Sequence, residues 1–342
     1  MKPITTYLDG FIKLGNYLHN IDPTCPTYSD LMDILHKAKQ KNAWFTKSNC
    51  LFALKSWGEA LTEASIAQWV QPYQFKNNDS KTVGLILAGN IPMVGFHDII
   101  SVLLCGHQAK VKLSSSDPYL IPFLYHQLVR LAPAFKNKLI FTQDELKGYD
   151  AIIATGSNNA ARYFNYYFSK VPHIIRKNRN GIAVLDGSET LEELNGLATD
   201  IVQYYGLGCR NISKVYIPKG YDLNLIFGAL YSHASLMDSA KYANNYDYNK
   251  AVFLMSEYEL LDNGFILLRE SNSFSSPVAC LHYQYYNNKE DLAIELEKEA
   301  DQIQCISSKI PFKNGIPLGK AQEPRLWDYA DGVDTIAFLT QL

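Results

Sequence analysis

The chain lacks the features that mark several common classes of protein. Its formal net charge is only −2 over 342 residues, so no global field would attract nucleic acid or an acidic membrane. No apolar run approaches the roughly 18 residues of a membrane-spanning helix. The N-terminus mixes Asp9 and Lys13 into its apolar residues, unlike a signal peptide. We therefore expect a cytoplasmic protein with no membrane span and no nucleic-acid partner.

Motifs for metals, disulfides and serine nucleophiles are also missing. The six cysteines form no C-x-x-C pair, and their spacing fits neither a zinc site nor a disulfide framework. The histidines show no H-E-x-x-H, so we predict no metal site. There is no G-x-S-x-G elbow and no G-x-G-x-x-G fingerprint. A metalloprotease, an α/β-hydrolase and a dinucleotide-binding fold with the usual glycines are therefore disfavoured.

What the chain does contain is the pattern of a folded α/β protein. Apolar residues make up 47% and charged residues 19%, and the length suggests two domains. Residues 1 to about 75 indicate amphipathic helices, followed by a polar loop over 76–81. From Thr82 onward β-rich runs alternate with helical ones, which predicts parallel sheets with crossover helices. Asp117 and Pro118 are typical of the N-cap and first residue of a helix, and we expect a domain boundary near 186–189.

Two segments that follow predicted strands carry candidate polar groups. Asn90 in "LAGNIPMVG" lies between a strand and a helix, where open α/β sheets bind ligands, and its amide could donate to an oxyanion. Ordinary turn chemistry is the alternative and the commoner use of Asn beside Gly. Lys112 ends the strand "QAKVKL", and Ser114 and Ser115 beside it add hydroxyls. Lys112 could reach a phosphate or ribose, or it could be a solvated strand-end lysine.

The remaining candidates lie at a helix start and around one cysteine. In "ATGSNNAAR", Gly156 and Ser157 open a helix whose N-terminus could hold a pyrophosphate, although plain capping by Ser157 explains the same residues. Cys209 stands between Gly208 and Arg210 ahead of a strand, where a tight turn and a positive charge would favour a reactive thiolate. The alternative is an inert buried thiol, the commoner fate of a cysteine.

The order of these motifs resembles the aldehyde dehydrogenase superfamily. It runs G-N-x-P, then K-L-S-S-x-D-P-Y, then T-G-S at a helix start, then G-x-C. Within that superfamily, the stretch "LAGNIPMVGFHDIISVLLCGHQAKVKLSSSDPYLIP" and the ending "GIPLGKAQEPRLWDYADGVDTIAFL" are similar to the acyl-CoA reductase family of bacterial luminescence systems. The resemblance covers residues 80 to 342. It implies two Rossmann-like domains, with the N-terminal helices and NADP(H) binding in 1–187 and catalysis in 188–342.

The resemblance also implies roles for the candidate residues. Cys209 matches the nucleophile, and Asn90 matches the amide that forms the oxyanion hole with the Cys209 backbone N–H. The nicotinamide cofactor would be bound by residues that match its ribose and pyrophosphate contacts, namely Lys112, Ser114, Ser115, Gly156 and Ser157.

Three departures from the usual superfamily pattern refine the expected function. Ser115 stands where many relatives have a glutamate that holds the adenosine ribose, which favours NADP(H) by removing repulsion against a 2′-phosphate. No E-L-G-G glutamate precedes Cys209, so hydrolysis of an acyl-cysteine would be poor and exchange with coenzyme A would be favoured. Ser273 in "SFSSPV" replaces the glutamate of E-I-F-G-P-V, which usually anchors the nicotinamide ribose.

We therefore expect an oxidoreductase that reduces an acyl-CoA or another acyl-thioester to an aldehyde through an acyl-cysteine. One alternative is an NAD(P)-dependent aldehyde dehydrogenase that works in the oxidative direction. The other is a non-catalytic module that uses the same fold to bind a nucleotide or a partner. A homodimer stays open as an assembly.

Overall fold

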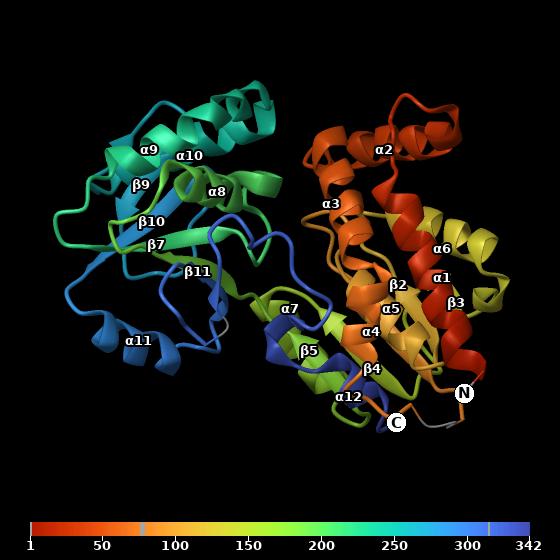
Figure 1. The fold of residues 1–342 in the computed structure, drawn as a ribbon. Coiled ribbons are helices and arrows are strands. Elements are labelled where there is room, and N and C mark those ends of the chain that lie inside the picture. The colour runs from red at the N-terminus through yellow and green to blue at the C-terminus, as the bar shows by residue number, and fades with distance from the viewer. Residues whose placement is uncertain (1, 76–78, 314) are drawn as a thin grey trace. The chain divides into compact units, whose positions relative to one another are not determined.

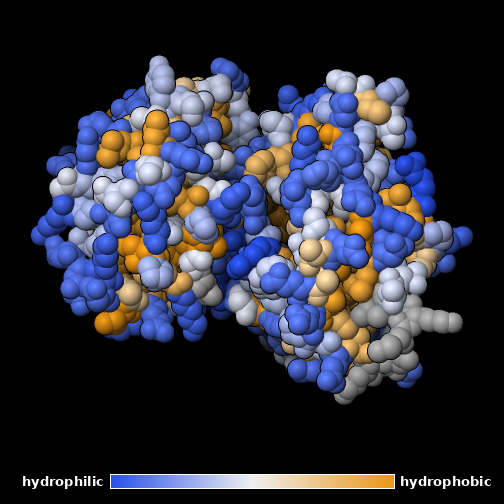
Figure 2. Space-filling model, in the orientation of Figure 1, coloured by the Kyte–Doolittle hydropathy of each residue, from blue (hydrophilic) through white to orange (hydrophobic). Residues whose placement is uncertain are grey.

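The computed structural model describes residues 2–75, 79–313 and 315–342, which form two compact units (Figure 1). Unit 1 contains residues 1–178 together with 324–342, and unit 2 contains residues 179–323. Residues 76–78 of the polar loop expected over 76–81 lie outside the described part. The surface drawn in Figure 2 is mostly hydrophilic with separate apolar patches. Within the described residues, no helix has both the length and the apolar character needed to cross a bilayer.

Unit 1 is built on a five-stranded parallel sheet in the order β3-β2-β1-β4-β5. Its strands are β1 (Thr82–Ile86), β2 (Gln108–Lys112), β3 (Leu139–Thr142), β4 (Ala151–Thr155) and β5 (His173–Arg176). The central strands β1 and β4 are buried apolar runs, and the sheet matches the expected alternation of strands with crossover helices. The fold class expected from the sequence is therefore confirmed in this unit.

The expected N-terminal helices are present, and α1 runs beside α3 (Figure 1). The helices of unit 1 are α1 (Lys2–His19), α2 (Ser29–Lys41), α3 (Lys47–Ala60), α4 (Glu63–Val70), α5 (Phe96–Leu104), α6 (Leu120–Leu131), α7 (Asn158–Tyr167) and α12 (Thr335–Leu339). The predicted cap of α6 is wrong, because this helix begins at Leu120 with Tyr119 at its N-cap. Asp117 is buried instead and accepts the N–H groups of Leu120 and Met93, both at 3.4 Å.

Unit 2 is built on a seven-stranded sheet in the order β12-β11-β6-β7-β10-β9-β8. Its strands are β6 (Asn180–Val184), β7 (Ile212–Pro218), β8 (Leu261–Asp262), β9 (Leu267–Glu270), β10 (Cys280–Tyr286), β11 (Ile303–Ser308) and β12 (Gly315–Ile316). Its helices are α8 (Leu191–Val202), α9 (Asn224–Leu230), α10 (Ala240–Met255) and α11 (Lys289–Lys298). Among the described strand pairs only β8 and β9 run antiparallel. Separate apolar clusters cover the two faces of this sheet.

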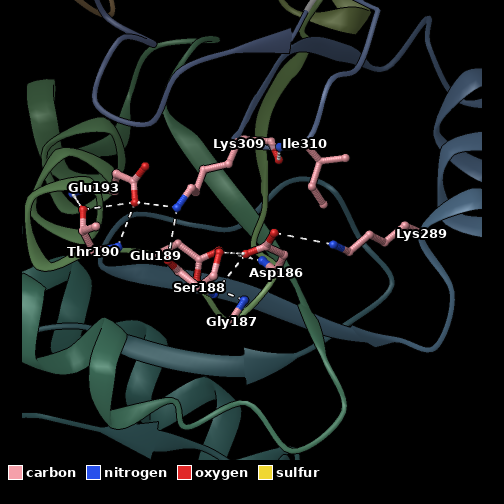
Figure 3. Close-up of polar contacts among 10 residues, drawn as sticks. Asp186, Gly187, Ser188, Glu189, Thr190, Glu193, Lys289, Lys309 and Ile310 are labelled. Carbon is pink, nitrogen blue, oxygen red and sulfur yellow. Dashed lines mark hydrogen bonds and ion pairs between the residues drawn. The ribbon is translucent and has the colours of Figure 1, made fainter.

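The division of the chain differs from the expected boundary at 186–189, which falls inside unit 2. Strand β6 ends just before this loop and pairs with both β7 and β11. Figure 3 shows the loop tied to other parts of the same unit. Asp186 lies 3.5 Å from Lys289, and Lys309 lies 3.1 Å from Glu193. Long-range strand pairing thus places the division near Asn178.

The last 19 residues also differ from expectation, because 324–342 return to unit 1. The Trp69 indole donates to the Tyr329 hydroxyl at 2.7 Å. Arg176 forms a 2.7 Å ion pair with Asp98 and donates to Thr335 at 2.9 Å, and all three side chains are buried. The segment assigned to a 188–342 domain by sequence is therefore divided between the units at residue 324.

Candidate functional site

The carboxyl edge of the unit 1 sheet gathers six of the seven candidate residues. Strand β1 has β2 on one side and β4 on the other, with Ile86 in register with both Lys112 and Ala154. The chain moves from β1 through β2 to β3, then crosses back to place β4 beyond β1. Ligands of open α/β sheets bind at such a reversal, outside the carboxyl ends of the strands. The loops that follow β1 and β4 contain Asn90 and Gly156.

The side chain of Asn90 is exposed, and its loop is held by hydrogen bonds before and after this residue. The amide of Asn42, just after α2, donates to the Gly89 carbonyl at 3.3 Å. The buried Asp117 carboxylate accepts the Met93 N–H, and burial raises the pKa of Asp117 to about 6. Met93 and Gly95 both have left-handed backbones, with φ of 67° and 82°. This conformation is strained at Met93, which is not a glycine; such strain persists where surrounding contacts fix the backbone, and it occurs often at functional sites.

Lys112 and the serines after it lie against this loop. The Leu87 N–H donates to the Lys112 carbonyl at 3.1 Å, which extends the pairing of β1 and β2 by one bond. Ser114 accepts the Ser116 N–H at 3.2 Å and fills the space where a Cβ on Gly89 would lie. Ser115 is exposed, and Lys112 is partly exposed. The first hydroxyl therefore shapes the turn, while the second faces solvent.

Gly156 and Ser157 start helix α7 beyond β4. Ser157 accepts the Ala160 N–H at 3.2 Å, so the capping role is confirmed. A Cβ on Gly156 would lie 2.9 Å from the Ala160 Cβ and 3.0 Å from the Phe164 ring. Glycine therefore permits close packing between the strand end and its helix. The remaining N–H groups of the first turn and the positive end of the helix dipole face the same edge.

Cys209 lies in unit 2, between a short helical turn (Gln203–Gly206) and β7. It is exposed, whereas the other five cysteines are buried or partly buried. Burial raises the pKa of three of those thiols, Cys50, Cys105 and Cys280, to about 12. Because the thiolate is the nucleophile, these three are poor candidates for covalent chemistry. Exposure therefore supports the reactive interpretation of Cys209 over the inert one.

The backbone before Cys209 forms a left-handed turn. Tyr204, Tyr205 and Gly206 have φ values of 53°, 59° and 75°, a conformation unfavourable for the two tyrosines. Asn211 holds the turn from the other side of the cysteine. Its side chain accepts the Gly208 N–H at 2.8 Å and donates to the Gln203 carbonyl at 2.7 Å. The Cys209 loop is thus fixed by side-chain bonds that only the folded chain reveals.

The "SFSSPV" segment lies in the loop between β9 and β10, and side chains from β7 and β10 bind three successive carbonyls of this loop, at residues 272–274. Lys214 donates to the Asn272 carbonyl at 3.0 Å and Ser213 donates to the Phe274 carbonyl at 2.6 Å. The His282 Nδ1 atom lies 3.0 Å from the Ser273 carbonyl and is therefore its donor. Burial lowers the pKa of Lys214 to about 8. The loop that carries Ser273 is therefore fixed without a glutamate.

The site residues missed by sequence reasoning are those that hold these loops, namely Asn42, Asn211 and Lys214. No local pattern distinguishes them, because their partners are set by tertiary packing. His97 lies 2.8 Å from the Leu326 carbonyl and packs beside Trp69 and Tyr329. Among the described residues, no group of three acidic, histidine or cysteine side chains could hold a metal ion.

Comparison with known sequences bears on the middle of the chain. Residues 71–225 match the family described as Acyl-CoA reductase (LuxC). The chain is 21% identical over 249 residues to a long-chain acyl-protein thioester reductase of Vibrio harveyi, covering 64% of this chain and 51% of that protein. It is 25% identical over 199 residues to the enzyme of the same name from Aliivibrio fischeri, covering 53% of this chain and 41% of that protein. The chain thus spans about half the length of these relatives or less.

Solved structures match nearly the whole chain. Aldehyde dehydrogenase 21 from Physcomitrella patens, in complex with succinate, has a TM-score of 0.69 at 10% identity and covers 99% of this chain and 84% of its own. An NAD⁺ complex of a Mycobacterium tuberculosis aldehyde dehydrogenase has a TM-score of 0.60 at 14% identity, covering 91% and 79%. The resemblance drawn from the motifs is confirmed: the chain has the aldehyde dehydrogenase fold and is similar to the acyl-CoA reductase (LuxC) family over residues 71–225.

Proposed function

We propose that the protein is an oxidoreductase that reduces an acyl-thioester to an aldehyde through an acyl-enzyme on Cys209. The observation that carries this proposal is the exposure of Cys209 on a constrained loop, while the thiols of Cys50, Cys105 and Cys280 are held in their protonated form by burial. The similarity to proteins named long-chain acyl-protein thioester reductases supports the substrate class. An exposed cysteine nucleophile suits a reducing compartment, so we place the enzyme in the cytoplasm.

In the first step the Cys209 thiolate attacks the carbonyl carbon of the acyl-thioester and forms a new C–S bond. In the roles that the resemblance implies, the Asn90 amide and the Cys209 backbone N–H would donate to the resulting oxyanion, and one such donor typically contributes about 3 kcal/mol. The tetrahedral intermediate collapses when the original C–S bond breaks. The thiolate of the original thioester leaves and takes up a proton from solvent, and the acyl group stays on Cys209 as a new thioester.

The carboxyl edge of the unit 1 sheet fits a nicotinamide dinucleotide. It offers Lys112 for the adenosine ribose and the α7 N-terminus with Gly156 and Ser157 for the pyrophosphate. Ser115 is exposed and neutral, which suits a 2′-phosphate and favours NADP(H). When bound, NADPH would supply the hydride that reduces the acyl carbon. The C–S bond to Cys209 then breaks, which releases the aldehyde and restores the thiolate.

The carboxylates between Ser157 and Cys209 do not offer a hydrolytic base. Glu189 accepts the N–H groups of Asp186 and Gly187 at 2.6 and 3.2 Å, and Glu193 closes the capping box of α8 with Thr190 (Figure 3). This loop follows the carboxyl end of β6, while Cys209 precedes the amino end of the parallel neighbour β7. The seven residues of β7 separate the two edges by about 20 Å.

The other carboxylates in this stretch do not change that conclusion. Asp186 bonds to Ser188 and Lys289, and Glu192 is exposed in the first turn of α8, at the edge opposite Cys209. Asp200 is buried and accepts backbone N–H groups. With no base from this stretch to activate water, an acyl-Cys209 would persist until hydride or a thiol reaches it. This favours reduction over the oxidative alternative that ends in hydrolysis.

The test is NADPH oxidation with acyl-CoAs of increasing chain length, compared between the wild type and Cys209→Ala. We expect aldehyde and free coenzyme A in equal amounts from the wild type and none from the variant. Equal turnover by the two proteins would exclude Cys209 as the nucleophile. Carboxylic acid formed from an aldehyde without coenzyme A would favour the oxidative alternative. Nucleotide binding without any turnover would favour the non-catalytic module.

A further inference from the structure

The end of α8 is joined to the segment 317–321 by one buried carboxylate. Asp200, only 1% exposed, accepts the Gly319 N–H at 2.7 Å on one oxygen and the Ala321 N–H at 3.0 Å on the other. Gly196 and Gly319 pack so closely that a Cβ on either would lie within 3 Å of the Cα of the other. This segment belongs to the "GIPLGKAQEP" stretch of the sequence, to which the proposed chemistry assigns no role.

Asp200 and Ala321 also contact the two residues that follow Cys209 in the chain. The Arg210 Nε atom donates to the Ala321 carbonyl at 2.5 Å. The Asn211 side chain donates to the Asp200 carbonyl at 3.0 Å. Asp200 therefore reaches the Cys209 loop by two routes, through its side chain and Ala321 to Arg210, and through its own carbonyl to Asn211.

We propose that Asp200 is the positioning residue of Cys209, and that the segment 317–321 serves as the support against which the nucleophile loop is held. The proposal rests on the proposed function for its catalytic meaning. A carboxylate is required because both of its oxygens accept backbone N–H groups. An asparagine would present its NH₂ group to one of these donors, and two facing donors leave a buried N–H unpaired.

The test compares Asp200→Asn with Asp262→Asn. Asp262 lies in the same unit and accepts the Gly264 N–H at 2.8 Å, but it holds the turn before β9, far along the chain from Cys209. The first readout is the rate of Cys209 alkylation by iodoacetamide, and the second is the rate of acyl adduct formation with an acyl-CoA. Thermal unfolding of each variant measures the loss of stability alone.

We expect Asp200→Asn to change the alkylation rate and to lower the rate of acyl adduct formation on the order of tenfold or more. Asp262→Asn should lose stability while both rates stay within about twofold of the wild type. If Asp200→Asn does not fold, Gly319→Ala tests the same support, because its added Cβ would press on Gly196.

Wild-type rates in a folded Asp200→Asn or Gly319→Ala variant would overturn the positioning role. The alkylation readout keeps this result separate from the proposed function, because iodoacetamide needs no acyl substrate. A wild type that is alkylated at Cys209 but is not acylated by any thioester would contradict the proposed function. The alkylation rates of the variants would then still decide whether Asp200 positions Cys209.

Discussion

Gly89 packs directly against Ser114, and a Cβ at residue 89 would overlap the Ser114 hydroxyl and side-chain carbon. This contact joins the loop after β1, which carries Asn90, to the loop after β2, which carries Ser115. The two sequence motifs that suggest an oxyanion hole and a cofactor site therefore depend on each other for their positions.

Replacing Gly89 with alanine should separate these loops. Because a misplacement of about 1 Å can cost a factor of 100 in rate, we expect kcat/KM to fall on the order of 100-fold. Gly228→Ala is the matched control, since nothing lies within 4 Å of its added Cβ in the middle of helix α9. Steady-state NADPH oxidation checks both, and equal rates for Gly89→Ala and Gly228→Ala would refute the dependence.

Ser115→Glu should reverse the preference between the two nicotinamide cofactors. A carboxylate at this exposed position would repel a 2′-phosphate and could accept the ribose hydroxyls of NADH. We expect the ratio of kcat/KM for NADPH over NADH to fall at least about tenfold, which corresponds to about 1.4 kcal/mol. Ser115→Gln keeps the size without the charge and should change the ratio less. A ratio unaffected by the charge would place the 2′-phosphate elsewhere.

The buried ion pair of Asp98 and Arg176 should be costly to break from one side. Removing one partner of such a pair typically costs about 3–5 kcal/mol, because the other charge stays buried without compensation. We therefore expect Asp98→Asn to lose this much stability in urea unfolding. The double variant Asp98→Leu/Arg176→Met should lose less than Asp98→Asn does. A loss below about 1 kcal/mol for Asp98→Asn would show that the pair is not desolvated in solution.

Asp117 should make stability fall as the pH rises from about 4 to about 6. Burial raises its pKa from 3.8 to about 6, so between these values the folded chain binds more protons than the unfolded chain. Relative to Asp117→Asn, the wild type should therefore lose on the order of 3 kcal/mol across this window and stay level above it. Urea unfolding of both proteins at several pH values measures the difference.

Asp186 should have the opposite effect on how stability changes with pH, and it serves as a control. Its hydrogen bonds from Ser188 lower its pKa to about 2, so its contribution to stability is present above pH 3.8 and is lost as the pH falls toward 2.

A stability difference between wild type and Asp117→Asn that rises with pH from 4 to 6 would contradict the assigned burial of Asp117.

The alternation of strands and helices was predictable because each strand is a short apolar run and each helix has its own local pattern. The positions of Asn90, Lys112, Ser157 and Cys209 relative to the strands and helices were predictable for the same reason. Each of these residues lies next to the end or start of a strand or at the start of a helix. The domain division was not, because it depends on β6 pairing with β11, more than 100 residues later.

The supports of the site were equally hidden from the sequence. Asp117 has the local signature of a helix cap, yet its side chain also turns to Met93, a contact that tertiary packing decides. Asp200 and Ala321 are 121 residues apart and meet through one hydrogen bond. Such partners carry no periodicity and no motif, so only the folded chain identifies them.

The most direct test of the central claim is the intact mass of the protein after incubation with an acyl-CoA in the absence of NADPH. We predict one acyl group per chain, mapped to the Cys209 peptide, absent from Cys209→Ala and released as aldehyde when NADPH is added. An adduct that persists in Cys209→Ala, or that leaves as a carboxylic acid when NADPH is added, would contradict the account.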